Sequence, residues 1–284
     1  MGPIIVPLDE STYAEQALPW AAMVARAQDR PVHLVTVRPS PEAYWEFADL
    51  GPDASIDAHQ ETVDDYLEHM RVADELKNVA VTLEVLDGDI VQQLTWLCER
   101  VRAELMVLTT RGRGGFGMGG VGSVADRLVR RLQMPVMVVP PDVQYVPVEA
   151  IMVPLDGSDE STRALSPARS LSQALPAALH LVHAVNPDAA WGLPDEHASQ
   201  YLSAMESRAR AHLESLAEPG DVVSVVQGAV PGALLDYAGE HGCRLVVMTT
   251  HGRVTEPMPE LGGIAAAMMR SIDRPVYFVR VPER

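Results

Sequence analysis

The sequence predicts an α/β protein built from two tandem, doubly wound, five-stranded parallel sheets with helices on both faces. Two observations support this fold class. The chain repeats itself, and within each copy short β-rich runs alternate with segments of helical periodicity. Strands that alternate with helices form parallel sheets through right-handed crossovers. We therefore expect two lobes, 1–145 and 146–284.

The repeat is visible in four pairs of segments that occur in the same order in both copies. IIVPLDES at 4–11 recurs as IMVPLDGS at 151–158, and HLVTVRP at 33–39 recurs as HLVHAVNP at 180–187. VLTTRG at 107–112 recurs as VMTTHG at 247–252, and MPVMVV at 134–139 recurs as RPVYFV at 274–279. Each copy is therefore expected to be a complete α/β unit.

Five apolar runs in the first copy predict strands: Ile4–Leu8, Val32–Val37, Val81–Leu86, Leu105–Leu108 and Val136–Val139. Most are continuous rather than alternating, which is typical of parallel strands buried on both faces. Apolar residues at helical spacing predict the intervening helices: Tyr13–Ala27, one marked by Val63, Leu67 and Met70, one over Ile90–Val101, and one starting at Ser123. The second copy repeats this scheme.

Charge and composition exclude several classes of function. The formal net charge of −17 opposes nucleic acid or an anionic membrane as a main partner, because both need a basic surface. The two cysteines, Cys98 and Cys243, lie in unrelated contexts and suit a reducing compartment. No run reaches the roughly 18 apolar residues of a membrane helix, and the first strand begins too early for a signal peptide. We expect a cytoplasmic protein.

A glycine-rich loop follows the fourth predicted strand of the first copy. The stretch TTRGRGGFGMGGVGSVADRL, residues 109–128, leaves the carboxyl end of that strand and enters the next helix. Ligands of doubly wound sheets bind at this end, and helix N-termini attract anions. Arg111 and Arg113 add positive charge, which favours phosphate binding. The alternative is a slack connection in which Ser123 only closes its helix, through a capping box with Asp126.

Other motifs are not supported. Gly112-x-Gly114-x-x-Gly117 matches the dinucleotide pattern as a string, but it follows the fourth strand rather than the first. Neither a P-loop lysine nor a G-x-S-x-G elbow occurs. His180 and His183 are three residues apart on a strand, so they point to opposite faces and cannot share a metal ion. Without a positioned general base near the loop, any hydrolysis should be slow.

The whole chain resembles a tandem universal stress protein of the UspA-like, nucleotide-binding type. Gly112, nine intervening residues and then Gly122-Ser123 match the spacing found after the fourth strand of nucleotide-binding members. VPLDES supplies Asp9, the acidic residue that ends the first strand in that family. Thr109 departs from the pattern, which has glycine there. The resemblance implies a Rossmann-like, adenine nucleotide alpha hydrolase-like fold in each copy.

The resemblance also implies an ATP site in the first lobe, with or without Mg²⁺. The residues it assigns to this site are Pro7, Asp9, Val37, Leu108, Thr109, Gly112, Arg113, Gly122, Ser123, Val124 and Ala125. Asp9 would accept hydrogen bonds from ribose or adenine, and the loop would hold the phosphates. The alternative for Asp9 is that it caps the first helix, and both roles can coexist.

The second lobe carries a weaker copy of this site. Its corresponding residues are Pro154, Asp156, Val185, Met248, Thr249, Gly252, Gly262, Gly263 and Ile264. Gly263 replaces the hydroxyl residue, and Glu256 and Glu260 lie in the loop, where carboxylates repel a triphosphate. We expect the second lobe to bind ATP much more weakly than the first, or not at all.

The function implied by the resemblance is that of an ATP-binding regulatory or stress-response protein, without catalytic residues or a metal site of its own. The alternatives are a slow ATPase and a ligand-free scaffold that binds an unidentified protein. The last strand of each copy, PVMVV and PVYFV, is a predicted sheet edge. Because such edges pair in this family, the resemblance implies an internal pseudo-dimer and allows a homodimer.

Overall fold

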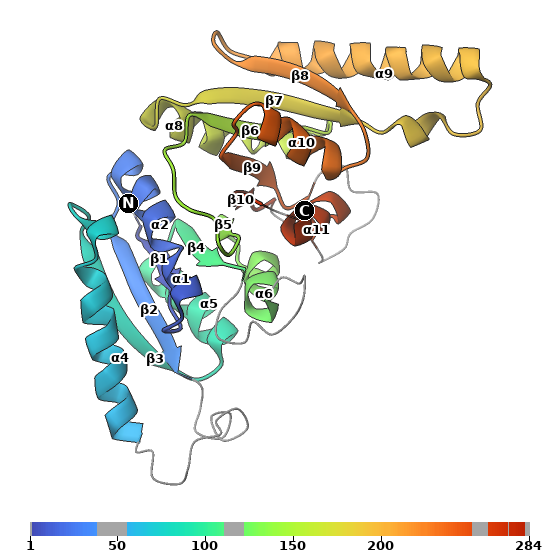
Figure 1. Ribbon diagram of the computed structural model, residues 1–284. Coiled ribbons are helices and arrows are strands. Elements are labelled where there is room, and N and C mark those ends of the chain that lie inside the picture. Colours follow the sequence, from blue (N-terminus) through green and yellow to red (C-terminus); the bar gives the residue numbers. More distant parts are fainter. Residues whose placement is uncertain (1, 39–55, 111–121, 252–260, 272, 282–284) are drawn as a thin grey trace. The chain divides into compact units, whose positions relative to one another are not determined.

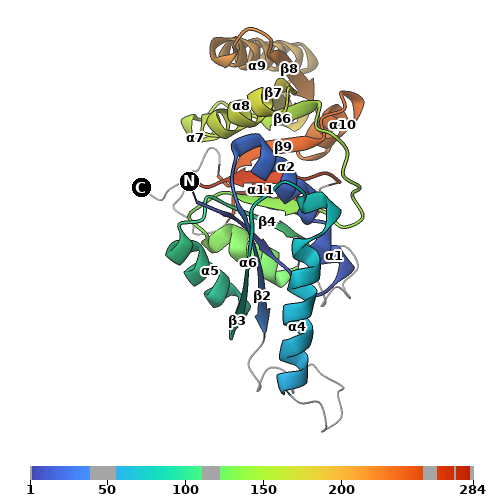
Figure 2. The ribbon, with the colours of Figure 1, turned by 90° about the vertical axis from the view of Figure 1, so that its left-hand side faces the viewer.

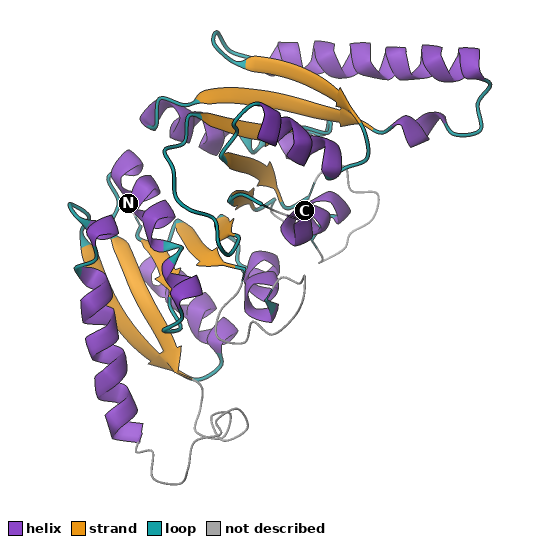
Figure 3. Cartoon of the chain, in the orientation of Figure 1, coloured by secondary structure: helices purple, strands orange, loops and turns teal. Residues whose placement is uncertain are grey.

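The computed structural model describes residues 2–38, 56–110, 122–251, 261–271 and 273–281. The chain divides into two compact units, Met1–Tyr145 and Val146–Arg284. In each unit strands alternate with helices along the chain, as Figure 3 shows. Each unit contains five parallel strands with helices on both faces, so the predicted fold class is confirmed.

The elements of the first unit, in chain order, are β1 (Ile4–Pro7), α1 (Thr12–Glu15), α2 (Leu18–Gln28), β2 (Val32–Arg38), α4 (Ile56–Arg71), the 3₁₀ helix η1 (Asp74–Leu76), β3 (Val81–Asp87), α5 (Ile90–Val101), β4 (Leu105–Thr109), α6 (Ser123–Arg131) and β5 (Val136–Val139) (Figure 1). The strand order is β3-β2-β1-β4-β5. Helices α2 and α4 cover one face of this sheet, and α5 and α6 cover the other (Figure 2).

The elements of the second unit are β6 (Ala150–Pro154), α7 (Asp159–Thr162), α8 (Leu165–Ala174), β7 (Ala178–Val185), the 3₁₀ helix η2 (Pro187–Ala190), α9 (Asp195–Leu216), β8 (Val222–Gln227), α10 (Gly232–Glu240), β9 (Leu245–Thr249), α11 (Gly263–Ser271) and β10 (Val276–Val279). Its strand order, β8-β7-β6-β9-β10, repeats that of the first unit. Within the described ranges every helix is too short or too polar to span a bilayer.

The central strands are buried on both faces, as their continuous apolar runs predict. In the first unit Ile4 pairs with Val32 on one side and with Leu105 on the other, and all three side chains are buried. Trp20 on α2 and Leu67 on α4 pack against this sheet and are almost completely buried. Burying each such side chain contributes about 1.5–3 kcal/mol to stability.

The single helix predicted over Tyr13–Ala27 is instead two helices, α1 and α2. Pro19 has no amide hydrogen, so it cannot donate to the carbonyl group four residues before it. The chain closes α1 with shorter bonds, from Gln16 to the Tyr13 carbonyl and from Ala17 to the Ala14 carbonyl. Pro19 then occupies the first turn of α2, where a missing donor is tolerated.

Candidate functional site

The strand order of each unit reverses between its first and fourth strands. In the first unit the chain fills β2 and β3 on one side of β1, and later fills β4 and β5 on the other side. Such a switch point leaves a crevice beyond the carboxyl ends of the two central strands, where doubly wound sheets bind ligands. Pro7 ends β1, and Leu108 and Thr109 end β4. Asp9 follows β1 by two residues, so these four predicted site residues lie at one rim of the sheet.

Asp9 organises the turn that leads from β1 into α1. Its Oδ1 accepts the Ser11 backbone amide at 3.1 Å and the Ser11 hydroxyl at 2.5 Å. The Ser11 hydroxyl oxygen in turn accepts the Ala14 amide at 3.2 Å, so Ser11 is the N-cap of α1. The alternative role of Asp9 as helix cap is therefore wrong, because Asp9 positions the cap rather than being it. Glu10 between them adopts φ +63°, the left-handed region.

Thr109 fits the position where the family pattern has glycine. It is the last residue of β4, pairs with Val139 of β5 and is buried. Extended strand backbone has a negative φ, which a β-branched residue adopts without strain. The next amide, of Thr110, continues the ladder by donating to the Val139 carbonyl at 3.0 Å. The departure from glycine at Thr109 thus leaves the strand geometry intact.

Gly122 closes the base of the glycine-rich loop. Its amide donates to the Thr110 carbonyl oxygen at 2.7 Å, which ties the end of the loop to the end of β4. A Cβ atom at Gly122 would lie 2.7 Å from that same oxygen, closer than real Cβ atoms approach. Glycine is therefore required here by the close approach of two backbone segments. Because its amide hydrogen is committed to Thr110, Gly122 positions the loop rather than offering that donor to a phosphate.

The first turn of α6 supplies backbone amides that lack an acceptor within the helix. The first intrahelical bond runs from the Asp126 amide to the Gly122 carbonyl at 3.1 Å. The amides of Ser123, Val124 and Ala125 therefore have no acceptor within the helix. Together with the positive end of the helix dipole, they form a site suited to an anion.

The capping-box alternative for Ser123 is not supported by the structure. The N-cap of α6 is Gly122, and no side chain caps the helix. The Asp126 carboxylate instead binds Arg130 through both oxygens, at 2.8 and 2.9 Å. The Ser123 side chain is exposed, and its hydroxyl has no partner among the described residues. It is therefore available as a further donor beside the three amides.

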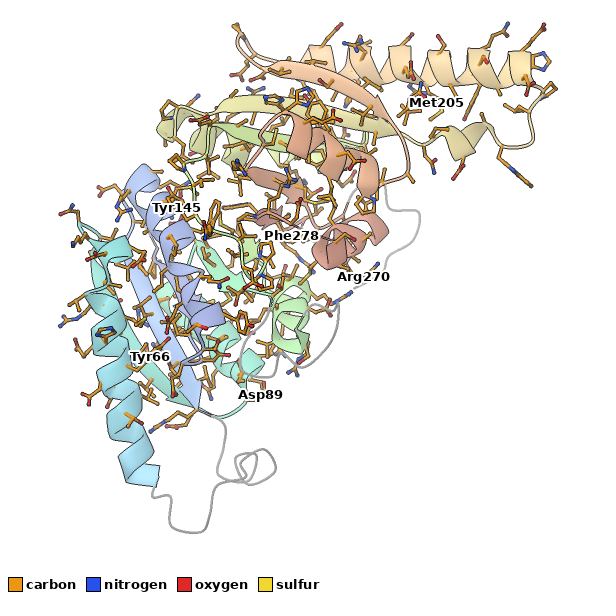
Figure 4. The ribbon with its side chains drawn as sticks, in the orientation of Figure 1. Tyr66, Asp89, Tyr145, Met205, Arg270 and Phe278 are labelled. Carbon is orange, nitrogen blue, oxygen red and sulfur yellow. The ribbon has the colours of Figure 1, made fainter. Side chains whose placement is uncertain are left out.

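The β1 side of the rim is acidic. Tyr66, which lies on α4 (Figure 4), donates a hydrogen bond to Glu15 at 3.1 Å. Burial raises the pKa of the Tyr66 hydroxyl, and the neighbouring charges of Glu15, Asp9 and Glu10 raise it further. Tyr66 is consequently a fixed donor at neutral pH. The two sides of the rim therefore differ in electrostatic character, with carboxylates beside β1 and amides without helical acceptors beside β4.

The remaining predicted residues of the first site are only partly described. Val37 is the penultimate residue of β2, next to β1 in the sheet, so it reaches the same rim. Gly112 and Arg113 lie outside the described residues, as does Gly252 of the second unit. Within the described ranges no group of three or more His, Cys, Asp or Glu side chains is placed to hold a metal ion.

The second unit repeats the frame of the site with different donors. Asp156 Oδ1 accepts the Ser158 amide and hydroxyl at 3.0 and 2.5 Å, and Gly262 donates to the Thr250 carbonyl at 2.9 Å. The loop closure and the turn after the first strand are therefore both kept. Helix α11 begins with Gly263 and the exposed Ile264, so its first turn offers amides without a hydroxyl.

The other predicted residues of the second site also reach its rim. Pro154 ends β6 and Val185 ends β7, while Met248 and Thr249 end β9. The Thr249 hydroxyl donates to the His251 carbonyl at 2.7 Å and is thereby engaged within the chain.

Sequence reasoning missed two parts of this architecture. The capping serines Ser11 and Ser158 follow an aspartate in a D-x-S pattern present in both copies, and that repetition was the available signal. The carbonyl groups of Thr110 and Thr250 act through the backbone, so residue type carries no sign of them.

Comparison with known proteins gives a consistent result. The model of the universal stress protein family matches residues 1–140 and again residues 147–280. A universal stress protein of Mycobacterium tuberculosis (strain CDC 1551 / Oshkosh) is 28% identical over 315 residues, which span 99% of this chain and 95% of the relative. These matches confirm the resemblance to tandem universal stress proteins.

A solved structure that covers nearly the whole chain shares the fold. The crystal structure of a universal stress protein from Archaeoglobus fulgidus DSM 4304 superposes with a TM-score of 0.66 at 19% identity, and the match covers 98% of both chains. A universal stress protein from Archaeoglobus fulgidus in complex with dAMP matches 49% of this chain and 97% of its own length, at 24% identity and a TM-score of 0.35.

Proposed function

Because the chain belongs to the universal stress protein family, we propose that its first unit, 1–145, binds ATP and that the second, 146–284, carries a degraded copy of the site. Occupancy of the first site would set the conformation that a partner protein recognises in a regulatory or stress response. The resemblance also predicts a partner protein, pairing of β5 with β10 through their edges, and a homodimer. These three stay predictions.

One observation carries the proposal. The first turn of α6, whose amides have no acceptor within the helix, lies at the switch point of the sheet, and the Gly122–Thr110 bond holds it there. The three amides, whose partial charges form the positive end of the helix dipole, and the exposed Ser123 hydroxyl suit a phosphate group. A phosphate bound there would lie beside β4.

The acidic side of the rim suits the other end of the nucleotide. Ribose hydroxyls and the adenine amino group are donors, and a carboxylate such as Asp9 only accepts hydrogen bonds. Phosphates would be repelled by Asp9, Glu10 and Glu15, so the polarity of the rim orients the ligand. Val37, at the end of the neighbouring strand, would contact the base. ATP, with or without Mg²⁺, satisfies both ends of this arrangement.

The second unit is proposed to bind ATP weakly or not at all. It keeps Asp156 and the closure by Gly262, but it lacks a hydroxyl at the start of α11. Glu256 and Glu260 precede that helix in the sequence and add negative charge near the expected phosphate position.

Calorimetric titration of the full chain, purified without added nucleotide, tests the proposal. We expect one ATP per chain and at least a tenfold loss of affinity in Asp9→Ala. Asp156→Ala is the matched control, because it removes the same serine-capping contacts from the other unit.

The remaining outcomes separate the alternatives. Two equal sites per chain would contradict the degraded second site. Absence of both binding and copurified nucleotide would favour a ligand-free scaffold. Single-turnover hydrolysis that Asp9→Ala abolishes would indicate a slow ATPase.

A further inference from the structure

Each unit buries one histidine at the same place in its second strand. His33 on β2 and His180 on β7 are 8% and 7% exposed. The sheet register places His33 opposite Thr82 of β3 and His180 opposite Val222 of β8. Both residues lie near the amino ends of their strands, away from the nucleotide rim. The chain therefore buries a histidine at two matching positions whose environments differ.

His33 has a carboxylate beside it. Its Nδ1 lies 2.7 Å from the Thr82 hydroxyl, and its Nε2 lies 3.2 Å from Glu84 on β3. Arg100 on α5 binds the same Glu84 carboxylate and stacks over the Trp96 ring, with its guanidinium carbon 4.3 Å from the ring centroid. A positive charge on His33 would therefore lie beside the Glu84 carboxylate, which already forms an ion pair with Arg100.

Within the described part of the chain, His180 contacts a tyrosine hydroxyl and a second histidine. Its Nδ1 lies 2.9 Å from the Tyr237 hydroxyl of α10, and that hydroxyl lies 2.9 Å from the Ser224 hydroxyl of β8. The His241 ring stacks on Tyr237 at 3.9 Å and lies 5.9 Å from His180. This cluster joins β7, β8 and the end of α10.

Among the described residues, the groups that act on the pKa of His180 include no carboxylate. Met152 of β6, its other neighbour in the sheet register, is uncharged. Next to Tyr237 lies Cys243, a buried thiol whose pKa burial raises to about 11, so it is neutral. Arg274 donates to the Cys243 carbonyl and is paired with Asp273, so that carboxylate is already engaged. Helices α8 and α9 cover the opposite face of β7.

The two histidines share a lowered pKa but differ in the charged groups that act on it. Burial lowers the pKa of His33, but the Glu84 carboxylate acts in the opposite direction. Burial lowers the pKa of His180 as well, and the neighbouring His241 lowers it further. Burial also raises the pKa of Tyr237, so its hydroxyl stays protonated and can donate to a neutral His180. Protonation of His180 would remove the acceptor of that bond.

We propose that the second unit is the more acid-sensitive half of this chain, in which proton uptake by His180 releases α10 from β7 and β8 before the first unit opens.

The pH window follows from the direction of the shift. A buried histidine with a lowered pKa binds fewer protons in the closed state than in the open state. The stability due to neutral His180 is complete above the unfolded value of 6.5, and it is lost as the pH falls below 6.5 toward the pKa of the closed state. Uptake of one proton raises the opening constant by up to about tenfold per pH unit within this window.

Hydrogen exchange of the full chain between pH 8 and pH 5, corrected for intrinsic rates and without nucleotide, tests the proposal. We expect protection of α10, β7 and β8 to fall by up to about tenfold per pH unit below 6.5, and protection of β2 and α5 to fall less. Ser224→Glu should remove the difference between the units. Ser224 lies two residues after Val222, which is opposite His180. Glu84 lies two residues after Thr82, which is opposite His33.

His180→Gln is the second variant, since glutamine can bond Tyr237 but cannot titrate. If it fails to fold, NMR titration of the His33 and His180 rings in the unchanged chain replaces it, and His180 should titrate below His33. Equal acid-induced exchange in both units would overturn the proposal. So would an acid response of α10 that persists in Ser224→Glu and in His180→Gln, or a His180 ring that titrates at or above His33.

Discussion

A Gly122→Ala substitution should displace the start of α6 from the end of β4. The backbone of Gly122 has φ −59° and ψ 141°, which alanine adopts without strain. The effect therefore comes only from the new Cβ atom, which would lie 2.7 Å from the Thr110 carbonyl oxygen. Ordinary contact begins at 3.4 Å, so the two segments must separate by about 0.7 Å.

That separation weakens the hydrogen bond from the Gly122 amide to the Thr110 carbonyl. The Gly122 amide lies 2.7 Å from the Thr110 oxygen, and the same movement stretches this distance to the limit of a hydrogen bond. Leaving a nearly buried carbonyl group without its donor costs about 1–3 kcal/mol. We expect the free energy of unfolding of the first unit to fall by about 2–3 kcal/mol, and ATP affinity to fall at least tenfold as the donors of α6 move.

Two glycines of the second unit provide graded controls. At Gly262 the added Cβ would lie 3.1 Å from the Thr250 oxygen, so Gly262→Ala should cost about 1 kcal/mol. At Gly263 nothing lies within 4 Å, and Gly263→Ala should stay within about 0.5 kcal/mol of the parent chain. Hydrogen exchange of β4 and α6, compared with β9 and α11, reports each unit separately, and calorimetry reports ATP. Equal stability and affinity in Gly122→Ala and Gly263→Ala would refute the closure argument.

Five further substitutions use the same contrast between units. Ser123→Ala should lower ATP affinity roughly tenfold while the urea midpoint stays unchanged, because the exposed hydroxyl caps nothing. Gly263→Ser should raise the affinity of the second unit for nucleotide by a similar factor, measured by calorimetry. Ser11→Ala should lower the stability of the first unit by about 1 kcal/mol in urea unfolding, through loss of the α1 cap; an unchanged midpoint would contradict that role. Gly157→Glu should destabilise the second unit by about 1 kcal/mol, since Gly157 has φ +82°, whereas Glu10→Gly at the matching φ of +63° should be neutral or stabilising.

The sequence was sufficient to predict the fold because the strands are buried on both faces. Continuous apolar runs such as Leu105–Leu108 have no plausible position other than the centre of a parallel sheet. The repeat then doubled the evidence for every element. The break between α1 and α2 could also be predicted, because Pro19 cannot donate a hydrogen bond inside a helix. The apolar periodicity continues across the break, however, and indicated a single helix.

The candidate site was predictable only where side chains define it. Asp9 and Ser123 were placed at the rim from their residue type and position. The assignment of Gly122 to the ATP site did not foresee that its amide bonds the Thr110 carbonyl, because residue type gives no sign of main-chain partners. The cap of α1 is Ser11 rather than Asp9, since the aspartate lies two residues before the N-cap position and bonds the serine instead.

The bond between Gly122 and Thr110, repeated by Gly262 and Thr250, sets where the helix after the fourth strand of each unit begins. In both units eleven residues of sequence, 111–121 and 251–261, separate the two bonded residues. Because the bond joins main-chain atoms, it does not depend on the type of the side chains between them. The two stretches therefore match in length, and transplanting 111–121 into the second unit, together with Gly263→Ser, should leave the start of α11 and the core of that unit unchanged.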